Sequence, residues 1–200
     1  WMGEILFRTK LSENLFKGLA PWMQKLPGGL IHVNVVGCAL FAAISGSSAA
    51  TVATVGKMSI PELRKRKYPE KILLGSLAGS GTLGLLIPPS IILIIYGVTV
   101  QESIAKLFIA GIIPGIMIAL IFMSYVIIWS LINKSVMPKS QETYSFFEKI
   151  KRSKQLLPVI LLILGVIGSI YSGVATATEA ASLGVVGALI LSYFQKSLNI

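Results

Sequence analysis

Long apolar runs without a charged side chain alternate with short basic segments along the chain. Four runs cover Leu30–Gly56, Ile72–Val100, Leu107–Asn133 and Leu156–Thr178, and a shorter one covers Ala180–Gln195. A helix that crosses a membrane needs roughly 20 mostly apolar residues, and each long run meets that length. The pattern therefore predicts an all-α integral membrane protein built from transmembrane helices.

Composition and charge agree with a membrane protein. Hydrophobic residues make up 54% of the chain and charged residues only 13%, against about 25% charged in a soluble domain. The net charge of +10 comes mainly from Lys and Arg between the apolar runs, and loops of that kind face the cytoplasm. The charge thus predicts sidedness in a lipid bilayer, not binding to nucleic acid. The crossings then alternate outward and back in the order Ile72–Tyr96, Leu107–Asn133, Leu156–Tyr171 and Ala180–Gln195.

The first apolar run has a small, polar centre, Ser45-Gly46-Ser47-Ser48. Basic residues precede the run and follow it, and a single crossing would put these two clusters on opposite sides of the membrane. A re-entrant hairpin keeps both in the cytoplasm, with Val33–Ile44 entering, a turn at the Ser-Gly-Ser-Ser stretch and Ala49–Gly56 returning. Non-helical backbone at membrane depth is tolerated only inside protein or beside a cavity. The alternative is a plain helix with a small-residue packing face.

A second interruption lies in residues 75–90, GSLAGSGTLGLLIPPS. Pro88 and Pro89 each remove a backbone donor and disfavour helix at the preceding residue, so we expect a discontinuous helix. Transporters use such breaks to bind ions with free carbonyls and anionic substrates with helix N-termini. Residues 79–84 also match the spacing of a dinucleotide-binding loop, but that loop follows a strand in a soluble unit. We therefore assign these glycines to unwinding or close helix contact.

Individual polar residues have simpler interpretations. Asn34 is expected to bond a neighbouring helix, His32 to lie at the membrane interface, and Cys38 to act as a small apolar residue. Thr176 and Glu179 fit a capping box. The chain has one His, one Cys and only eight acidic residues, which leaves little material for acid–base catalysis, so we do not expect an enzyme.

These features divide the chain into six segments. Residues 8–27 carry Leu15, Leu19 and Trp22 at helical spacing, which predicts a helix in the membrane interface or, alternatively, one packed on protein. The expected segments are the end of a transmembrane helix plus this interfacial helix (1–29), the re-entrant hairpin (30–57), a basic cytoplasmic loop (58–71), the broken transmembrane helix with its return helix (72–133), a second basic loop (134–154) and two further helices (155–200).

The stretches LFAAISGSSAATVATVGKMSIPELRKRKY, GSLAGSGTLGLLIPPSIILIIYGV, LFIAGIIPG and GVATATEAASLGVV occur in this order along nearly the whole chain. Together they resemble the large membrane subunit of the tripartite ATP-independent periplasmic (TRAP) transporters, of the DctM type. The resemblance implies an elevator-type transporter with inverted repeats in the bacterial inner membrane. It implies Na⁺-driven import of organic acids such as four-carbon dicarboxylates or sialic acids, with no cofactor besides Na⁺. It also implies two partners, a periplasmic substrate-binding protein and a small membrane subunit.

Several residues correspond to motifs of that family. The hairpin tip corresponds to Ser45, Gly46, Ser47 and Ser48, the unwound stretch beside it to Gly79, Ser80, Gly81 and Thr82, and the IPPS motif to Pro88, Pro89 and Ser90. As a hypothesis, the first two groups form one Na⁺ site through Ser45, Ser47, Ser48 and Thr82.

The resemblance also implies a longer chain, with a second hairpin and a second broken helix, so we expect this sequence to be a fragment of the subunit. It opens in mid-pattern, since residues 1–7 have the character of a helix end. Two other interpretations stay open at this point. One is a different Na⁺/carboxylate symporter that works without a binding protein, and the other is a fragment that does not transport and only packs with partner helices.

Overall fold

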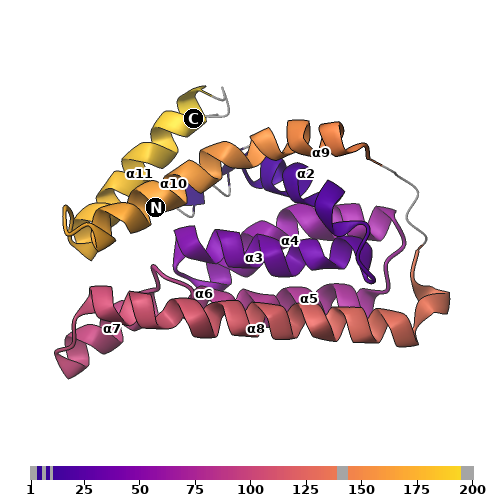
Figure 1. The fold of residues 1–200 in the computed structure, drawn as a ribbon, viewed down its shortest axis with the longest axis horizontal. Coiled ribbons are helices and arrows are strands. Elements are labelled where there is room, and N and C mark those ends of the chain that lie inside the picture. The colour runs from indigo at the N-terminus through magenta and orange to yellow at the C-terminus, as the bar shows by residue number, and fades with distance from the viewer. Residues whose placement is uncertain (1–3, 6–7, 10, 139–143, 195–200) are drawn as a thin grey trace.

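A computed structural model shows an all-helical bundle and describes residues 4–5, 8–9, 11–138 and 144–194 (Figure 1). The expected helix end in residues 1–7 lies largely outside these ranges. The α-helices are α2 (Leu11–Met23), α3 (His32–Ser45), α4 (Ser48–Lys65), α5 (Glu70–Gly81), α6 (Leu83–Leu86), α7 (Ile91–Val100), α8 (Ile104–Ile132), α9 (Phe146–Ser153), α10 (Leu157–Tyr171) and α11 (Ala177–Phe194). Short 3₁₀ turns cover Gly29–Ile31, Lys134–Val136 and Lys154–Leu156.

Four helical stretches are long and apolar enough to cross a membrane. They are Glu70–Val100, Ile104–Ile132, Phe146–Tyr171 and Ala177–Phe194, which confirms the runs expected from the sequence. Their outer faces are apolar as well as exposed: on α8, Ile113 is 76% exposed and Ile132 is 77% exposed. Apolar area of this extent is unusual on a soluble monomer and matches a lipid-facing surface.

The α3–α4 pair occupies the centre of the bundle. Its two helices pack along each other, and α3 also contacts α2, α5, α6 and α8. The main core contains Val33, Cys38 and Phe41 of α3 with Val55 and Leu63 of α4, all at most 1% exposed. In Figure 1 the pair lies between α8 on one side and α9–α11 on the other. The polar Ser45–Ser48 turn thus joins two helices whose buried residues form much of the main core.

The structure differs from the sequence prediction in the second arm of this pair. The arm was expected to end at Gly56 and to be followed by a loop over residues 58–71, but α4 continues to Lys65. Leu63 is buried in the core, and Glu62 forms an ion pair with Arg66 one turn later, so packing and an i,i+4 pair extend the helix through Pro61. The predicted loop therefore shortens to the few residues before α5.

Helix α2 packs on protein more than the interfacial interpretation requires. Leu15 and Leu19 are buried in the main core, while Trp22 is 41% exposed. The indole N–H of Trp22 donates to Ser153 Oγ at 2.8 Å, and the Lys149 ammonium lies 5.4 Å from the centre of the indole ring. These contacts attach α2 to α9. The second predicted loop, 134–154, accordingly contains α9 as a helix with a capping box at Ser145 and Glu148.

Candidate functional site

The turn between α3 and α4 is built from two residues that end one helix and start the next. Gly46 caps α3 with φ of +61° and donates its N–H to Ala42 O at 3.0 Å. Ser47 is extended, and its hydroxyl accepts the Ala50 N–H at the start of α4. Glycine adopts the left-handed conformation without the cost that a side chain would add. The predicted turn at Ser45–Ser48 is therefore confirmed.

Three oxygen atoms meet at this tip. Ser45 Oγ lies 2.8 Å from Thr51 Oγ1, and each hydroxyl donates to Ser47 O, at 3.2 Å and 2.8 Å respectively. Ser45 Oγ lies at the C-terminal end of α3, where the helix dipole is negative and favours a cation, whereas Ser47 O and Thr51 Oγ1 belong to the start of α4, where the dipole is positive. Thr51 was missed by the sequence analysis. Its spacing of four from Ser47 is the signal that could have found it, because residues four apart share one face of a helix.

The second interruption is a true break, and it lies later than expected. Helix α5 ends at Gly81, α6 covers Leu83–Leu86, and α7 begins at Ile91, so the longest non-helical stretch is residues 87–90. Pro88 and Pro89 lie in it, and the buried Ser90 hydroxyl donates to Leu85 O at 2.7 Å. The IPPS motif, rather than the glycines before it, interrupts the helix.

The prediction that residues 79–82 are unwound is wrong for three of the four residues. Gly79, Ser80 and Gly81 are all helical as the last residues of α5, and the buried Ser80 hydroxyl donates to Ser76 O inside that helix. Thr82 alone separates α5 from α6. It is exposed, and its hydroxyl donates to Gly79 O at 2.7 Å. Serine and threonine can donate to the carbonyl three or four residues earlier, which lets this glycine-rich stretch stay helical.

The two interruptions meet backbone to backbone. The Ile91 N–H donates to Gly46 O at 3.2 Å, and a Cβ at Gly46 would lie 2.6 Å from Pro89 O. On the other side of the tip, a Cβ at Gly84 of α6 would lie 2.8 Å from the backbone nitrogen of Ser48. Only residues without a side chain permit such an approach. The structure thus brings Ser45–Ser48 against both α6 and Pro89–Ile91.

Comparison with known proteins places the sequence in a family. The sequence model described as "Tripartite ATP-independent periplasmic transporter, DctM component" matches residues 1–200. The chain belongs to the DctM family of TRAP transporter permeases. This confirms the resemblance drawn from the sequence, and it places the chain in a membrane transport family rather than an enzyme family.

Relatives in the DctM family carry different substrate names. The chain is 40% identical over 168 residues to the C4-dicarboxylate TRAP transporter large permease protein DctM of Pseudomonas aeruginosa, a match that covers 84% of this chain and 38% of that protein. It is 36% identical over 185 residues to the sialic acid TRAP transporter permease protein SiaT of Haemophilus influenzae, covering 92% and 29% respectively. It is 35% identical over 188 residues to the ectoine/5-hydroxyectoine large permease protein UehC of Ruegeria pomeroyi, covering 94% and 43%.

The chain therefore spans less than half the length of these DctM-family relatives. Their names include a dicarboxylate, a sialic acid and ectoines, so membership does not by itself select a substrate. The tip and the broken helix described above both lie inside the matched region, since the family match runs over residues 1–200.

Asn34 joins the first arm to the broken helix of this DctM-family chain. The side chain is fully buried, and its amide nitrogen donates to Leu73 O at 3.1 Å and to Ser76 Oγ at 3.0 Å. The Ser76 hydroxyl in turn donates to Leu73 O at 3.1 Å. The expectation that Asn34 bonds a neighbouring helix is confirmed, and α5 is that helix.

The other polar residues singled out from the sequence have structural roles. The Thr176 N–H donates to Glu179 Oε2 at 2.8 Å, and the Glu179 N–H donates to Thr176 Oγ1 at 3.3 Å, which confirms the capping box. Cys38 is buried in the core. His32 is fully buried in the protein, and its Nε2 contacts Pro27 O at 2.7 Å. Its place at the membrane interface stays a prediction.

Metal coordination by acidic, His or Cys side chains has no support in the part of the chain that the structure describes. Within those residues, no group of three such side chains could hold a metal ion. The oxygen atoms gathered at the tip are hydroxyls and a carbonyl, which are neutral ligands. A site of this kind suits a hard monovalent cation bound by helix ends and unwound backbone.

Proposed function

We propose that this chain forms part of the large membrane subunit of a TRAP transporter that imports small organic acids with Na⁺. The observation that carries the proposal is the contact between the Ser45–Ser48 tip and residues 89–91, in a chain of the DctM family. Two interrupted helices that meet in this way supply free carbonyls for a cation and helix N-termini for an anion. The C4-dicarboxylate and sialic acid names of the relatives agree with an anionic substrate.

The α3–α4 pair acts as a re-entrant hairpin in this proposal. The Leu30 N–H, just before α3, donates to the hydroxyl of Tyr68, three residues after α4, at 3.1 Å. Both ends of the pair therefore lie on one side of the bundle. Helix α3 has 14 residues and α4 has 18, about 21 Å and about 27 Å at 1.5 Å per residue, and both are shorter than the roughly 30 Å hydrocarbon core. A pair of this length enters the membrane and returns without crossing it.

Na⁺ binds at the tip in this proposal, through Ser45 Oγ, Thr51 Oγ1 and the carbonyl of Ser47, whose mutual contacts are 2.8–3.2 Å. The negative end of α3 attracts the cation, and the positive start of α4 opposes it, so the three oxygen atoms carry the binding. Ser48 opens α4 beside these atoms and stays a predicted member of the site. Thr82 also stays a prediction, although its hydroxyl is exposed and bonded to Gly79 O, which makes it the outermost member of the set.

Partners and location follow the family in this proposal. A periplasmic binding protein delivers the substrate, a small membrane subunit supports the large one, and the assembly lies in the bacterial inner membrane. Four helices of spanning length support the membrane location. An elevator-type motion would carry the tip and the broken helix together, since their backbones are in contact.

Uptake by reconstituted vesicles tests the function. The permease as its gene encodes it, with its small subunit, is placed in proteoliposomes and offered labelled succinate or sialic acid with its purified binding protein. We expect uptake that needs an inward Na⁺ gradient and the binding protein, and no uptake with a K⁺ gradient of equal size. Uptake of equal rate without the binding protein would instead favour the symporter interpretation, and uptake indifferent to Na⁺ would contradict the proposal.

A further inference from the structure

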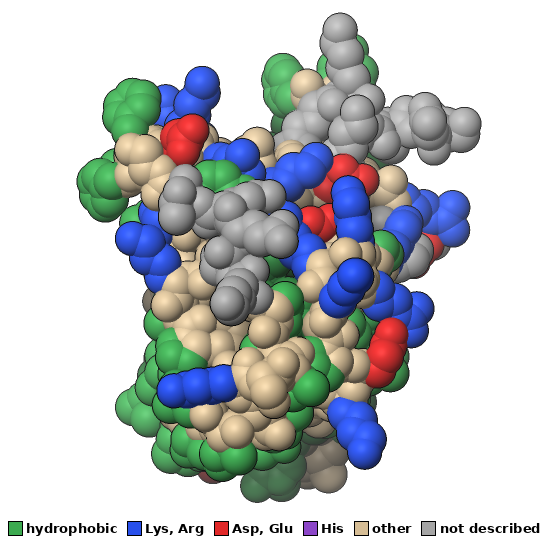
Figure 2. Space-filling view, turned by 90° about the vertical axis from the view of Figure 1, so that its right-hand side faces the viewer, with side chains coloured by type: hydrophobic (Ala, Val, Ile, Leu, Met, Phe, Trp, Pro, Cys, Tyr) green, Lys and Arg blue, Asp and Glu red, His purple; other side chains and the backbone are tan. Residues whose placement is uncertain are grey.

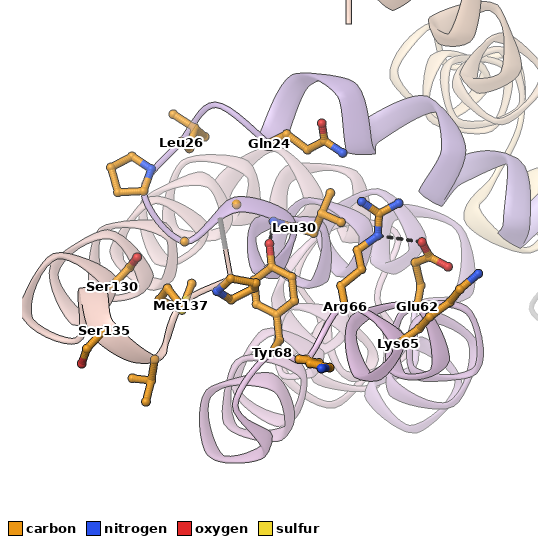
Figure 3. Close-up of a pocket in the computed structure, with 16 residues that line it drawn as sticks. Gln24, Leu26, Leu30, Glu62, Lys65, Arg66, Tyr68, Ser130, Ser135 and Met137 are labelled. Atoms are coloured by element: carbon orange, nitrogen blue, oxygen red, sulfur yellow. Dashed lines mark hydrogen bonds and ion pairs between the residues drawn. The ribbon is translucent and has the colours of Figure 1, made fainter. Parts of the chain in front are cut away.

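A cavity of about 920 Å³ opens at the end of the bundle opposite the tip (Figure 3). Three segments far apart in sequence form its walls: residues 24–30 before α3, residues 62–68 at the end of α4, and residues 130–138 at the end of α8. The volume lies within the range of small-ligand sites, roughly 300–1,000 Å³. None of its lining residues belongs to the candidate site described above.

The cavity is lined by more cations than anions. Lys65, Arg66 and Lys67 contribute three positive charges, and Glu62 contributes one carboxylate, which pairs with Arg66 at 2.8 Å. Lys65 and Lys67 are exposed. Figure 2 shows Lys and Arg side chains gathered over this end of the molecule. The C-termini of α4 and α8 add partial negative charge, but the formal positive charge outweighs it, so the cavity attracts an anion.

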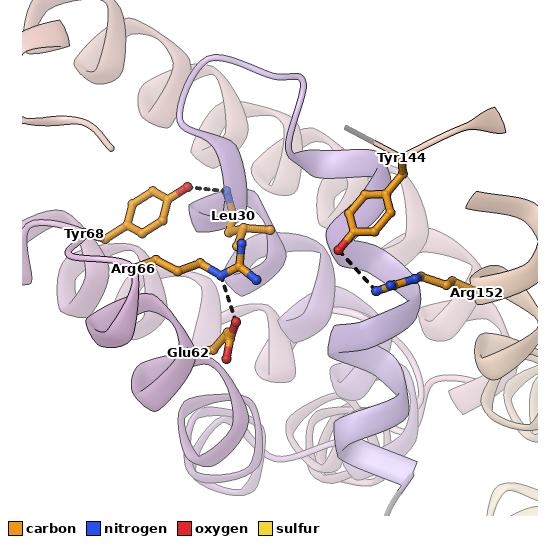
Figure 4. Close-up of polar contacts among 6 residues, drawn as sticks. All are labelled: Leu30, Glu62, Arg66, Tyr68, Tyr144 and Arg152. Atoms are coloured by element: carbon orange, nitrogen blue, oxygen red, sulfur yellow. Dashed lines mark hydrogen bonds and ion pairs between the residues drawn. The ribbon is translucent and has the colours of Figure 1, made fainter. Parts of the chain in front are cut away.

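Neutral hydrogen-bonding groups complete the lining. Gln24 is 8% exposed, and its Oε1 is buried without a hydrogen-bond partner. The two ends of an amide are interchangeable by rotation, so the same side chain can present its NH₂ to an anion. Tyr68 Oη already accepts the Leu30 N–H (Figure 4), which leaves its own proton to donate. A buried amide oxygen without a hydrogen-bond partner, in a cavity that three cations also line, calls for a ligand.

Apolar surface adjoins the cavity on the α8 side. Ser130 lines it, while the neighbouring Ile128 and Ile132 are 57% and 77% exposed on the outer face of α8. Val136, also in the lining, is 54% exposed. A ligand with a phosphate group and acyl chains can place the phosphate among the cations and lay its chains along α8. Basic pockets between transmembrane helices bind anionic lipid headgroups by this chemistry.

We propose that this cavity, walled by Gln24, Lys65, Lys67, Tyr68 and Ser130, binds the phosphate-bearing headgroup of an anionic phospholipid. Lys65 and Lys67 supply the charge, Tyr68 and Gln24 donate hydrogen bonds to phosphate oxygens, and the apolar face of α8 receives the acyl chains. The segments before α3, after α4 and after α8 all contact the headgroup. The bound lipid therefore holds these three segments together.

Native mass spectrometry of the purified permease tests the assignment. Dioctanoyl phosphatidylglycerol, dioctanoyl phosphatidylcholine and glycerol phosphate are titrated separately, so that an anionic lipid, a neutral lipid and a free phosphate ester are distinguished. Lys65→Gln with Lys67→Gln removes the charge, and Gln24→Met removes the amide at nearly constant volume. Lys151→Gln with Lys154→Gln, on exposed positions of the α9 region outside the cavity, is the matched control for loss of two charges.

We expect one phosphatidylglycerol to bind, with affinity lowered about tenfold or more in the Lys65/Lys67 variant. Gln24→Met should lower the affinity by a smaller factor, and the Lys151/Lys154 control should leave it unchanged. Equal losses in the two double variants would overturn the proposal. Equal binding of phosphatidylcholine, or binding of glycerol phosphate as tight as that of the lipid, would overturn the assignment to an anionic phospholipid.

Discussion

The amide nitrogen of Ile91 and the carbonyl oxygen of Gly46 are joined by a hydrogen bond of 3.2 Å. This bond connects the first residue of α7 to the C-cap residue of α3, at the place where the α3–α4 turn meets the broken helix. A main-chain contact of this kind fixes the tip against the broken helix and leaves no room for a side chain at Gly46. Its geometry sets how close the two elements can come, and substitutions at the contact therefore have a defined cost.

Gly46→Ala should destabilise the tip. The residue has φ of +61°, which costs a side-chain-bearing residue about 1–2 kcal/mol, and the new Cβ would lie 2.6 Å from Pro89 O. We expect a lower thermal unfolding temperature and a strong loss of uptake. Gly75→Ala is the control, because nothing lies within 4 Å of its Cβ position on α5. Equal unfolding temperatures for the two variants would contradict the close contact.

Thr51→Val should weaken Na⁺ binding by tenfold or more. The substitution keeps the shape of the side chain but removes the hydroxyl that contacts Ser45 Oγ and Ser47 O. Thr99→Val is closely matched, since Thr99 also donates to the carbonyl four residues earlier, at 2.8 Å, but lies exposed on α7. The Na⁺ dependence of uptake measures the effect. An unchanged Na⁺ affinity in Thr51→Val, or the same change in both variants, counts against the ion site at the tip.

Ser47→Ala combined with Thr82→Ala tests two further predicted ion ligands in the same assay. A further loss of Na⁺ affinity when Thr82→Ala is added to Ser47→Ala would keep Thr82 in the site. Ser47→Ala keeps the carbonyl that the proposed site uses, and the Thr82 hydroxyl is exposed and bonded to Gly79 O, so we expect a small effect from either single variant. A full effect from Thr82→Ala alone would show that the hydroxyl turns toward the tip when Na⁺ binds.

Asn34→Leu should lower the free energy of unfolding by about 1–3 kcal/mol, because it removes two hydrogen bonds to α5 and leaves Leu73 O with one partner fewer. Unfolding in a detergent series or by thermal shift measures it. Asn133→Ala provides the comparison, since that amide bonds only the end of its own helix, at Trp129 O. A smaller loss for Asn34→Leu than for Asn133→Ala would contradict its role between helices.

High pH should destabilise the chain through Tyr68. Burial raises the pKa of its hydroxyl, while the Leu30 N–H and the charge of Arg66 oppose that shift. Folding thus favours the neutral phenol: the stabilisation is complete below the unfolded-state pKa of about 10 and is lost as pH rises through the higher folded-state pKa. Tyr68→Phe should flatten the fall in unfolding temperature above pH 10, whereas Tyr193→Phe, at an exposed position, should follow the parent protein.

Thiol labelling tests whether the α3–α4 pair re-enters the membrane. In a Cys38→Ala background, single cysteines replace Lys25, Lys67 and Glu102, and intact cells are treated with an impermeant reagent. Lys25 and Lys67 lie near the two ends of the pair, and Glu102 lies in the turn between α7 and α8. We expect Lys25→Cys and Lys67→Cys to react only after permeabilisation and Glu102→Cys to react in intact cells. Reaction of only one of the first two in intact cells would mean a plain crossing.

Local sequence signals determined the parts of the fold that depend on few residues. Runs without charge predicted the four spanning helices. The small, polar Ser45–Ser48 stretch between two basic clusters predicted the turn, and Pro88–Pro89 predicted the break. The extent of α4 was wrong because Lys57, Pro61 and Arg64 resemble a loop, while the burial of Leu63 decides for helix. The predicted unwinding of Gly79–Gly81 was wrong for a related reason, since the Ser80 hydroxyl and packing keep these residues helical.

Contacts between distant segments were beyond sequence reasoning. The meeting of Gly46 with Ile91 and of Gly84 with Ser48 depends on how three helices pack, which no single stretch encodes. The cavity was even harder to predict, because its walls come from segments separated by more than 30 residues. Thr51 lay within reach, however, because its spacing from Ser47 could be read directly from the chain.

The bonds of Asn34 also have a consequence for the order of events during synthesis. Its amide nitrogen finds its partners at Leu73 and Ser76, and Gly46 O finds its partner at Ile91. The first arm therefore leaves the ribosome dozens of residues before its hydrogen-bond partners do. Until those partners emerge, its polar atoms must bond water or the insertion machinery. The bond between Gly46 O and Ile91 N–H can form only after Ile91 has emerged from the ribosome, so a chain stalled before that point should leave the α3–α4 segment open to protease.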